Sequence, residues 1–278
     1  MEDDMHTTEQ LREVAERAAR TAGAELRHVF RGEMSVDSKR DLHDLVTEHD
    51  RAAEQTILQV LRDESEEWTV IGEEYGEQGP ASDTVWYVDP IDGTSNFAQG
   101  IAFFCVSVGV EVAGELAAGA VFDPMADLMF SADEHGAYLD GRPLRTPQAR
   151  PHGHGNLITG YPTARDLEVE GPAALADLGR CIEAFSSVRR TGSGALTIAH
   201  VAAGWTDVAL GTSVSPWDVA AAALVLERAG GRYEPLWFGR DPGDSPAHLA
   251  PGFVARSPGA EYPVFERVVD GIRERRAS

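Results

Sequence analysis

Hydrophobic and polar positions follow two different periods along this chain. Residues 7–30 and 47–61 carry apolar side chains at every third or fourth position, which predicts two amphipathic helices. Each segment starts with a Thr that stands three residues before a Gln or an Asp, the spacing of a capping box. Compact apolar runs at residues 68–71 and 85–88 predict strands instead.

Short strands and helices continue through the rest of the chain. Residues 103–112 and 116–122, separated by a Gly-containing turn, predict an antiparallel hairpin, and residues 137–143 predict one more strand with a turn. The segment 147–156 is rich in Pro, Gly and His, which predicts a boundary between two lobes of one domain, about 1–148 and 149–278. The second lobe has an α/β pattern. Its predicted strands are 157–159, 188–190 and 207–210, and its predicted helices are 172–185, 196–203, 219–228 and 262–272.

An acidic turn follows the predicted strand at 85–88. That strand should end at Asp89, because Pro90 cannot donate a further ladder hydrogen bond. Asp92 follows three residues later, and Gly93 permits a tight turn that brings the two carboxylates together. Crowded carboxylates raise each other's pKa unless a cation lies between them, and hard oxygen ligands select Mg²⁺, Mn²⁺ or Ca²⁺ over zinc. An ordinary Asp-rich turn explains the same residues, so this motif alone leaves both interpretations open.

Other acids stand at the ends of predicted elements. Glu73 follows the strand at 68–71, and it would lie at the same sheet edge as Asp89 if the two strands share a sheet. Asp50 and Asp218 lie in the first turns of two predicted helices, where an acid complements the helix dipole. Taken singly, each of these acids is explained by a loop or a helix cap.

Composition narrows the class of protein. The chain has 278 residues, 42% of them hydrophobic, and a formal net charge of −22 from 46 acidic and 24 basic residues, which argues against a nucleic-acid surface. Neither a signal peptide nor an apolar run of the ~20 residues that span a bilayer is recognised. Cys105 and Cys181 imply no disulfide framework. A cytoplasmic enzyme without a nucleic-acid or membrane partner is the simplest expectation. Lys39 is the sole lysine.

Taken together, the motifs resemble the inositol monophosphatase family over nearly the whole chain. The segments that carry the resemblance are Asp44-Leu45-Val46-Thr47 with Asp50, Gly72-Glu73-Glu74, Asp89-Pro90-Ile91-Asp92-Gly93-Thr94, and Trp217-Asp218-Val219-Ala220-Ala221. The resemblance implies an α/β (α+β) fold, a layered αβαβα sandwich, usually assembled as a homodimer. It also implies dependence on Mg²⁺, with Mn²⁺ as a possible substitute, and inhibition by Li⁺.

The resemblance further assigns roles to individual residues. One Mg²⁺ would be surrounded by Glu73, Asp89, the Ile91 carbonyl and Thr94, a second by Asp89, Asp92 and Asp218, and a third, weaker one would lie at Glu73. Asp50 would sit near the second ion, and Lys39 beside the catalytic site. The expected substrate contacts are Asp92, Gly93, Thr94, Ser95, Gly192, Ser193, Gly194 and Asp218. We hypothesise that Thr94 and Glu73 orient the attacking water and receive its proton.

The sequence leaves the substrate open. Inositol monophosphate or a similar small polyol phosphate is the first expectation. Many inositol-hydrolysing members carry a Glu shortly before the Trp-Asp motif, whereas residues 209–216 contain no acid, so Thr212, Ser213 or Ser215 would have to replace it. The alternatives are histidinol phosphate, fructose 1,6-bisphosphate or a nucleotide 3′-phosphate. An alternative of another class is a regulatory protein that binds RNA or the transcription machinery.

Overall fold

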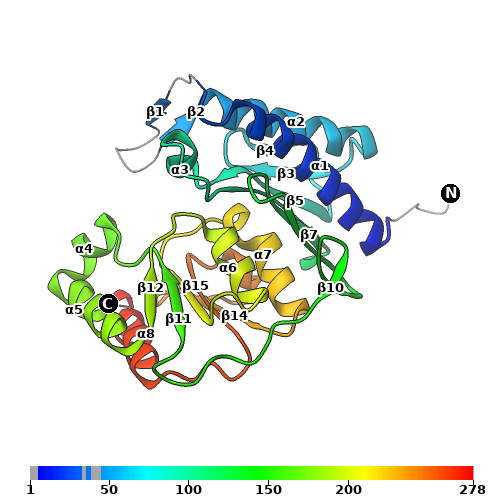
Figure 1. The fold of residues 1–278 in the computed structure, drawn as a ribbon. Coiled ribbons are helices and arrows are strands. Elements are labelled where there is room, and N and C mark those ends of the chain that lie inside the picture. Colours follow the sequence, from blue (N-terminus) through cyan, green and yellow to red (C-terminus); the bar gives the residue numbers. More distant parts are fainter. Residues whose placement is uncertain (1–5, 33–35, 39–44, 278) are drawn as a thin grey trace.

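The first layer of the fold consists of two long helices that cover one face of a sheet. In the computed structural model, which describes residues 6–32, 36–38 and 45–277, these are α1 (Thr8–Val29) and α2 (Glu48–Glu64). Both helices begin with the predicted capping box, since the hydroxyls of Thr7 and Thr47 accept backbone N–H bonds in the first turns. Both helices lie over one face of the sheet (Figure 1). Leu26 and Ile57 are buried in an apolar cluster that the helices share with the sheet.

The second layer is an eight-stranded sheet in the order β10-β9-β8-β7-β6-β5-β3-β4. All neighbouring strands are antiparallel except β3 and β5, which run parallel. The strands are β3 (Thr69–Gly72), β4 (Gly76–Gln78), β5 (Thr84–Asp92), β6 (Cys105–Val112), β7 (Glu115–Asp123), β8 (Leu128–Asp133), β9 (Gly136–Leu139) and β10 (Arg142–Leu144). The predicted hairpin is confirmed as β6–β7. β4 lies between the predicted strands at 68–71 and 85–88, and the predicted single strand at 137–143 is the β9–β10 hairpin.

Two helices fill the space between this sheet and a second one. They are α6 (Gly194–Ala202) and α7 (Pro216–Arg228) (Figure 1), and most of their residues are buried. Such all-round apolar helices are typical of a position with protein on both sides. One apolar cluster contains both helices together with residues of both sheets.

The second sheet has five strands in the order β12-β11-β13-β15-β14. They are β11 (Asn156–Thr159), β12 (Ser187–Arg189), β13 (Val208–Gly211), β14 (Arg232–Leu236) and β15 (Gly252–Arg256). β11 runs parallel to β12 and β13, whereas β15 is antiparallel to β13 and β14. The last layer covers its other face with α4 (Ala164–Glu170), α5 (Pro172–Ala184) and α8 (Pro263–Arg276).

The observed order of layers confirms the predicted αβαβα sandwich. Short elements complete it: β1 (Val36–Ser38) pairs with β2 (Leu45–Thr47), α3 (Thr94–Ala98) follows β5, and a 3₁₀ turn spans Ala247–Leu249. The division into two lobes stays a prediction. Cys105 and Cys181 are free and buried. Among the residues that the structure describes, none of the helices combines the length and the apolar character that crossing a bilayer requires.

Candidate active site

The parallel pair β3–β5 brings two of the predicted acids to one sheet edge. Gly72 pairs with Val88, so Glu73 and Asp89 are the next residues of the two strands. The Glu73 N–H donates to the Val88 carbonyl at 3.1 Å, which holds the two chains together beyond the regular ladder. Asp89 is only 2% exposed, whereas Glu73 is half-buried. The register of β3 against β5 therefore places Glu73 and Asp89 at the same edge of the sheet.

β5 does not end at Asp89, which corrects the sequence interpretation. It runs to Asp92, and its pairing with β6 shifts register between Asp89 and Asp92. The irregular register accommodates Pro90, because a bulge leaves one residue without a ladder partner. Within it, Asp89 Oδ1 accepts the Ile91 N–H at 3.0 Å. The bulge thus places two carboxylates and the Ile91 carbonyl at the end of a single strand.

Gly93 makes the turn from β5 into α3 possible. Its φ of +105° lies in the left-handed region, where a side chain is strained. A Cβ at this position would also lie 3.1 Å from the Phe103 carbonyl oxygen. The next residue, Thr94, has its hydroxyl 3.0 Å from the Ile91 carbonyl and 3.0 Å from Asp50 Oδ1. Ser95 is exposed and accepts a bond from Gln99.

Asp92 connects the first sheet to the middle layer. Its Oδ2 accepts the Ser193 hydroxyl at 2.5 Å and the Ala195 N–H at 2.6 Å, and its Oδ1 accepts the Gly194 N–H at 3.0 Å. These donors form the N-terminus of α6, where the helix dipole favours an anion. Ser193, predicted as a substrate contact, is 3% exposed, and its hydroxyl is committed to Asp92.

Asp218 approaches the same place from α7. Its Oδ2 accepts the Ser215 N–H at 2.8 Å in a capping box, so the helix cap also orients this carboxylate. Burial, and then the charge of Asp92, raises the pKa of Asp218 to about 8. Burial and the neighbouring acid therefore outweigh the helix N-terminus, which would favour the ionised carboxylate.

The four acids Glu73, Asp89, Asp92 and Asp218 form an electrostatic cluster. Burial raises the pKa of Asp89 well above its ordinary value, and the charges of the other three raise it further. A hard divalent cation suits this donor set, since it would offset the repulsion. Among the described residues, however, no three acidic, His or Cys side chains are arranged to hold a metal ion. Both oxygens of Asp92 and one oxygen of Asp218 accept backbone N–H groups.

Asp50 lies at the base of this cluster. It is fully buried, and its Oδ2 accepts both the N–H and the hydroxyl of Thr47, at 2.7 and 2.6 Å. Burial raises its pKa despite these bonds. Its other oxygen, Oδ1, accepts a hydrogen bond from the Thr94 hydroxyl, so the cap of α2 also positions Thr94. Lys39, predicted beside the catalytic site, lies outside the described residues.

Sequence reasoning missed Glu54, one turn after Asp50 on α2. It is fully buried, and its carboxylate accepts the Glu74 and Tyr75 N–H groups at 2.8 and 3.0 Å. It therefore holds the turn that follows Glu73. A Cβ on Gly72 would lie 2.0 Å from Glu54 Oε1, which explains the glycine before Glu73. The available signal was an acid on the buried face of an amphipathic helix.

A cavity of about 230 Å³ opens beside the cluster. Asp92 and Asp218 line one side of it, and Gly192, Ser193 and Gly194, the predicted substrate contacts, line it as well. Thr212 and Ser213 also line it. The structure thus brings two of the acids and three of the other predicted substrate contacts to one concave site.

The layered fold and the acids gathered at its strand and helix ends define an α/β sandwich protein with a candidate site for a cation and a small ligand. The chain belongs to the inositol monophosphatase family, whose model matches residues 7–263. It is 37% identical over 224 residues to the Nus factor SuhB of Pseudomonas aeruginosa, covering 78% of this chain and 82% of the relative.

Solved structures agree with this assignment. The extragenic suppressor protein SuhB from Bartonella henselae superimposes with a TM-score of 0.80 at 29% identity, covering 96% of this chain and 98% of the other. An inositol monophosphatase from Anabaena gives a TM-score of 0.76 at 27% identity, with 96% and 95% covered. The similarity therefore extends over both sheets.

Proposed function

We propose that this chain is a Mg²⁺-dependent phosphate monoester hydrolase that acts on inositol monophosphate or a similar small polyol phosphate. The observation that carries the proposal is the buried Asp89, surrounded by three further carboxylates beside a cavity. Membership of the inositol monophosphatase family supports the phosphatase class. Homodimer assembly, cytoplasmic location and Li⁺ inhibition remain expectations of the same proposal.

The residues that would hold Mg²⁺ are Glu73, Asp89, the Ile91 carbonyl, Asp92 and Asp218. When bound, Mg²⁺ supplies Lewis-acid activation of the attacking water and neutralises charge on the departing oxygen. The protein's own contribution is to gather these oxygens on rigid elements. The bulge of β5 holds Asp89 and Asp92, the end of β3 holds Glu73, and the first turn of α7 holds Asp218.

Thr94 and Asp50 would control the attacking water. The Thr94 hydroxyl has one proton and two acceptors at 3.0 Å, the Ile91 carbonyl and Asp50 Oδ1. While it donates to Asp50, its lone pairs can accept a hydrogen bond from the water and so orient it. Glu73 is half-buried and not part of a helix cap. It would accept a hydrogen bond from the other O–H of the water and take up that proton as the base.

The cavity wall fits a hydroxylated substrate. Ser213 is exposed and supplies a hydroxyl group, whereas the Thr212 hydroxyl lines the same wall but donates to Asp166 at 3.0 Å. Gly93 and Thr94 would direct backbone N–H groups toward the phosphate at the start of α3. Residues 209–216 contain no acid, so recognition of the substrate hydroxyls would rest on these neutral groups.

A second candidate function follows from the relatives' names. A relative at 37% identity is named Nus factor SuhB, which supports the regulatory member of the fold as an alternative for this chain. The net charge of −22 speaks against direct RNA binding. Retention of a labelled RNA by the purified protein at physiological salt would favour this candidate. Failure to bind would exclude a regulatory role through direct RNA binding.

The proposal is tested by phosphate release from a panel of monoesters with Mg²⁺ and with EDTA. Asp89→Asn should lower kcat by several orders of magnitude while the circular dichroism spectrum stays unchanged, because it removes the central carboxylate. Asp83→Asn is the matched control, since Asp83 is exposed just before the same strand, and it should keep normal turnover. Near-normal turnover of Asp89→Asn in Mg²⁺ would refute the mechanism.

A further inference from the structure

A second, larger cavity adjoins the acid cluster. Its volume is about 600 Å³, within the size range of small-ligand sites. Glu73 and Asp218 belong to its lining, and it shares Thr212, Ser213, Val214 and Asp218 with the smaller cavity. The two cavities therefore lie on either side of the same segment, and a ligand bound at the acids can extend into the larger one.

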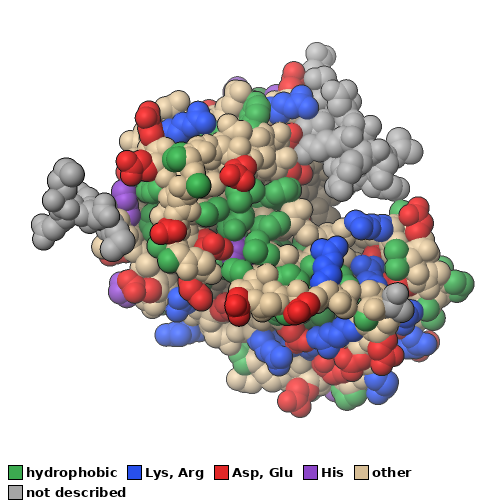
Figure 2. Space-filling model, turned by 180° about the vertical axis from the view of Figure 1, so that it is seen from behind, with side chains coloured by type: hydrophobic (Ala, Val, Ile, Leu, Met, Phe, Trp, Pro, Cys, Tyr) green, Lys and Arg blue, Asp and Glu red, His purple; other side chains and the backbone are tan. Residues whose placement is uncertain are grey.

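The charge of this cavity differs from that of the chain as a whole. The chain has a net charge of −22, yet four arginines line this one cavity. They are Arg165, Arg240, Arg275 and Arg276. Figure 2 shows Lys and Arg side chains gathered where the molecule is hollowed between its two halves. A local excess of cations in an acidic protein indicates an anionic ligand.

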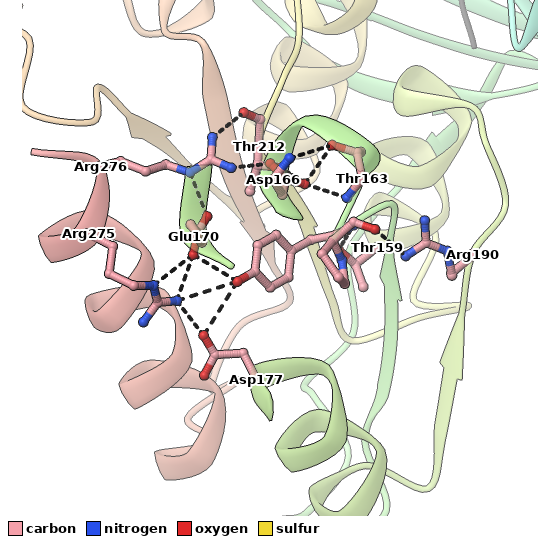
Figure 3. Close-up of polar contacts among 11 residues, drawn as sticks. Thr159, Thr163, Asp166, Glu170, Asp177, Arg190, Thr212, Arg275 and Arg276 are labelled. Atoms are coloured by element: carbon pink, nitrogen blue, oxygen red, sulfur yellow. Dashed lines mark hydrogen bonds and ion pairs between the residues drawn. The ribbon is translucent and has the colours of Figure 1, made fainter. Parts of the chain in front are cut away.

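Two of these arginines are neutralised by buried carboxylates. Arg275 pairs with Glu170 and Asp177, and Arg276 pairs with Asp166 and Glu170 (Figure 3). The three acids are at most 2% exposed as side chains, so their charges depend on the two arginines for compensation. Arg275 and Arg276 act as a scaffold beside the cavity.

That scaffold anchors the two segments that carry the other arginines. Arg276 binds Asp166, the neighbour of Arg165 in the first turn of α4. Its guanidinium also lies 4.6 Å from the ring centroid of Phe238, two residues before Arg240. One buried arginine thus fixes both positions relative to the Thr212 carbonyl, to which it donates at 3.0 Å.

Arg165 and Arg240 themselves are exposed. Within the described part of the chain, neither forms an ion pair with a carboxylate, and the backbone N–H of Arg240 closes a turn onto Trp237 at 3.1 Å. A guanidinium presents paired N–H donors that match phosphate oxygens. Among the described residues, Arg165 and Arg240 therefore offer two unpaired guanidinium groups to a cavity that also contains Glu73 and Asp218 in its lining.

We propose that Arg165 and Arg240 bind a second phosphate of the substrate while its scissile phosphate lies at the acid cluster. The substrate class is then a small phosphate monoester that carries a further phosphate on the same molecule. This inference rests on the proposed hydrolase function, and it replaces inositol monophosphate by a substrate that carries two phosphates. A polyol with a single phosphate would leave both arginines without a ligand.

The test uses matched substrate pairs that differ only in the second phosphate. They are adenosine 3′,5′-bisphosphate against adenosine 3′-monophosphate, and fructose 1,6-bisphosphate against fructose 1-phosphate, assayed for kcat/KM with Mg²⁺. The wild type should prefer the bisphosphate of at least one pair, and that pair identifies a nucleotide or a sugar substrate. Arg165→Gln and Arg240→Gln should each reduce kcat/KM for the bisphosphate about tenfold, because each removes a charge-assisted hydrogen bond. The monophosphate rates should stay within about twofold.

Arg267→Gln is the matched control. Arg267 is an exposed arginine on α8, and it lines neither of the two cavities. Binding of each bisphosphate is measured in parallel by calorimetry with EDTA-treated protein, so that it does not depend on turnover. Equal kcat/KM for both members of each pair, unaltered by either variant, would overturn this inference while leaving the hydrolase proposal intact. Arginine-dependent binding without any phosphate release would instead support the anion site and refute the hydrolase.

Discussion

Replacing Arg276 by Ala should destabilise the fold more than any other single arginine change on α8. The Arg276 side chain is 11% exposed, and it contacts the fully buried carboxylates of Asp166 and Glu170. It also donates to the Thr212 carbonyl at 3.0 Å. Removing one partner of a buried ion pair costs about 3–5 kcal/mol, because the other charge stays buried without compensation.

The remaining partners set the expected size within that range. Asp166 keeps hydrogen bonds from Thr163 and Thr212, and Glu170 keeps Arg275, so we expect a loss of about 3 kcal/mol. For a chain of this length that corresponds to a melting temperature lower by about 6 °C.

Equilibrium urea denaturation measures the loss. Arg273→Ala is the control: it lies three residues earlier on the same helix, its side chain is 39% exposed, and its pairs should contribute about 0–1 kcal/mol. If the two variants unfold at the same urea concentration, the buried network does not stabilise the fold as argued here.

Three further changes probe the acid cluster. Gly93→Ala should cost about 1–3 kcal/mol and most of the activity, because φ is +105° and the new Cβ would meet the Phe103 carbonyl; an unchanged melting temperature would contradict this. Ser193→Ala should cost about 1 kcal/mol through the lost bond to Asp92, against no loss for the exposed Ser95→Ala, both measured by urea denaturation. Burial raises the pKa of Glu54 from 4.5 to about 7, so the folded state holds a proton that the unfolded chain releases. The EDTA-treated protein should therefore lose stability as pH rises through this window, and Glu54→Gln should flatten that dependence. An identical pH profile for the variant would rule out Glu54 as the source.

Local signals in the sequence were sufficient for the first helices and for the acids. The capping boxes at Thr7 and Thr47 and the parallel placement of Glu73 and Asp89 depend on residues close together in the chain or on one strand register. The end of β5 was predicted too early. Pro90 removes a donor, but a register shift absorbs that loss, and only the pairing with β6 reveals it.

Long-range pairing accounts for most of what the sequence did not show. α4 carries buried acids that would be unfavourable by themselves, and their partner Arg276 is 110 residues away from Asp166. Nothing in the α4 segment indicates that partner. β14 and β15 were missed for a related reason, since their short segments become strands only when β15 pairs with β13. The hydrophobic periodicity of a single segment does not predict contacts with segments far away in the chain.

The acid cluster is also a junction in the fold, and this links cation binding to stability. Glu73 and Asp89 belong to the first sheet, Asp92 caps α6 and Asp218 begins α7, so like charges meet where two layers pack. Repulsion among them weakens that contact in the absence of a cation. An ion that binds only the folded state adds about 2.7 kcal/mol at a concentration 100 times its dissociation constant. Saturating Mg²⁺ should therefore raise the melting temperature, and Asp89→Asn should remove most of that increase while making the metal-free protein more stable. If Mg²⁺ raised the melting temperature of the wild type and of Asp89→Asn equally, the stabilising ion would not bind at the acid cluster.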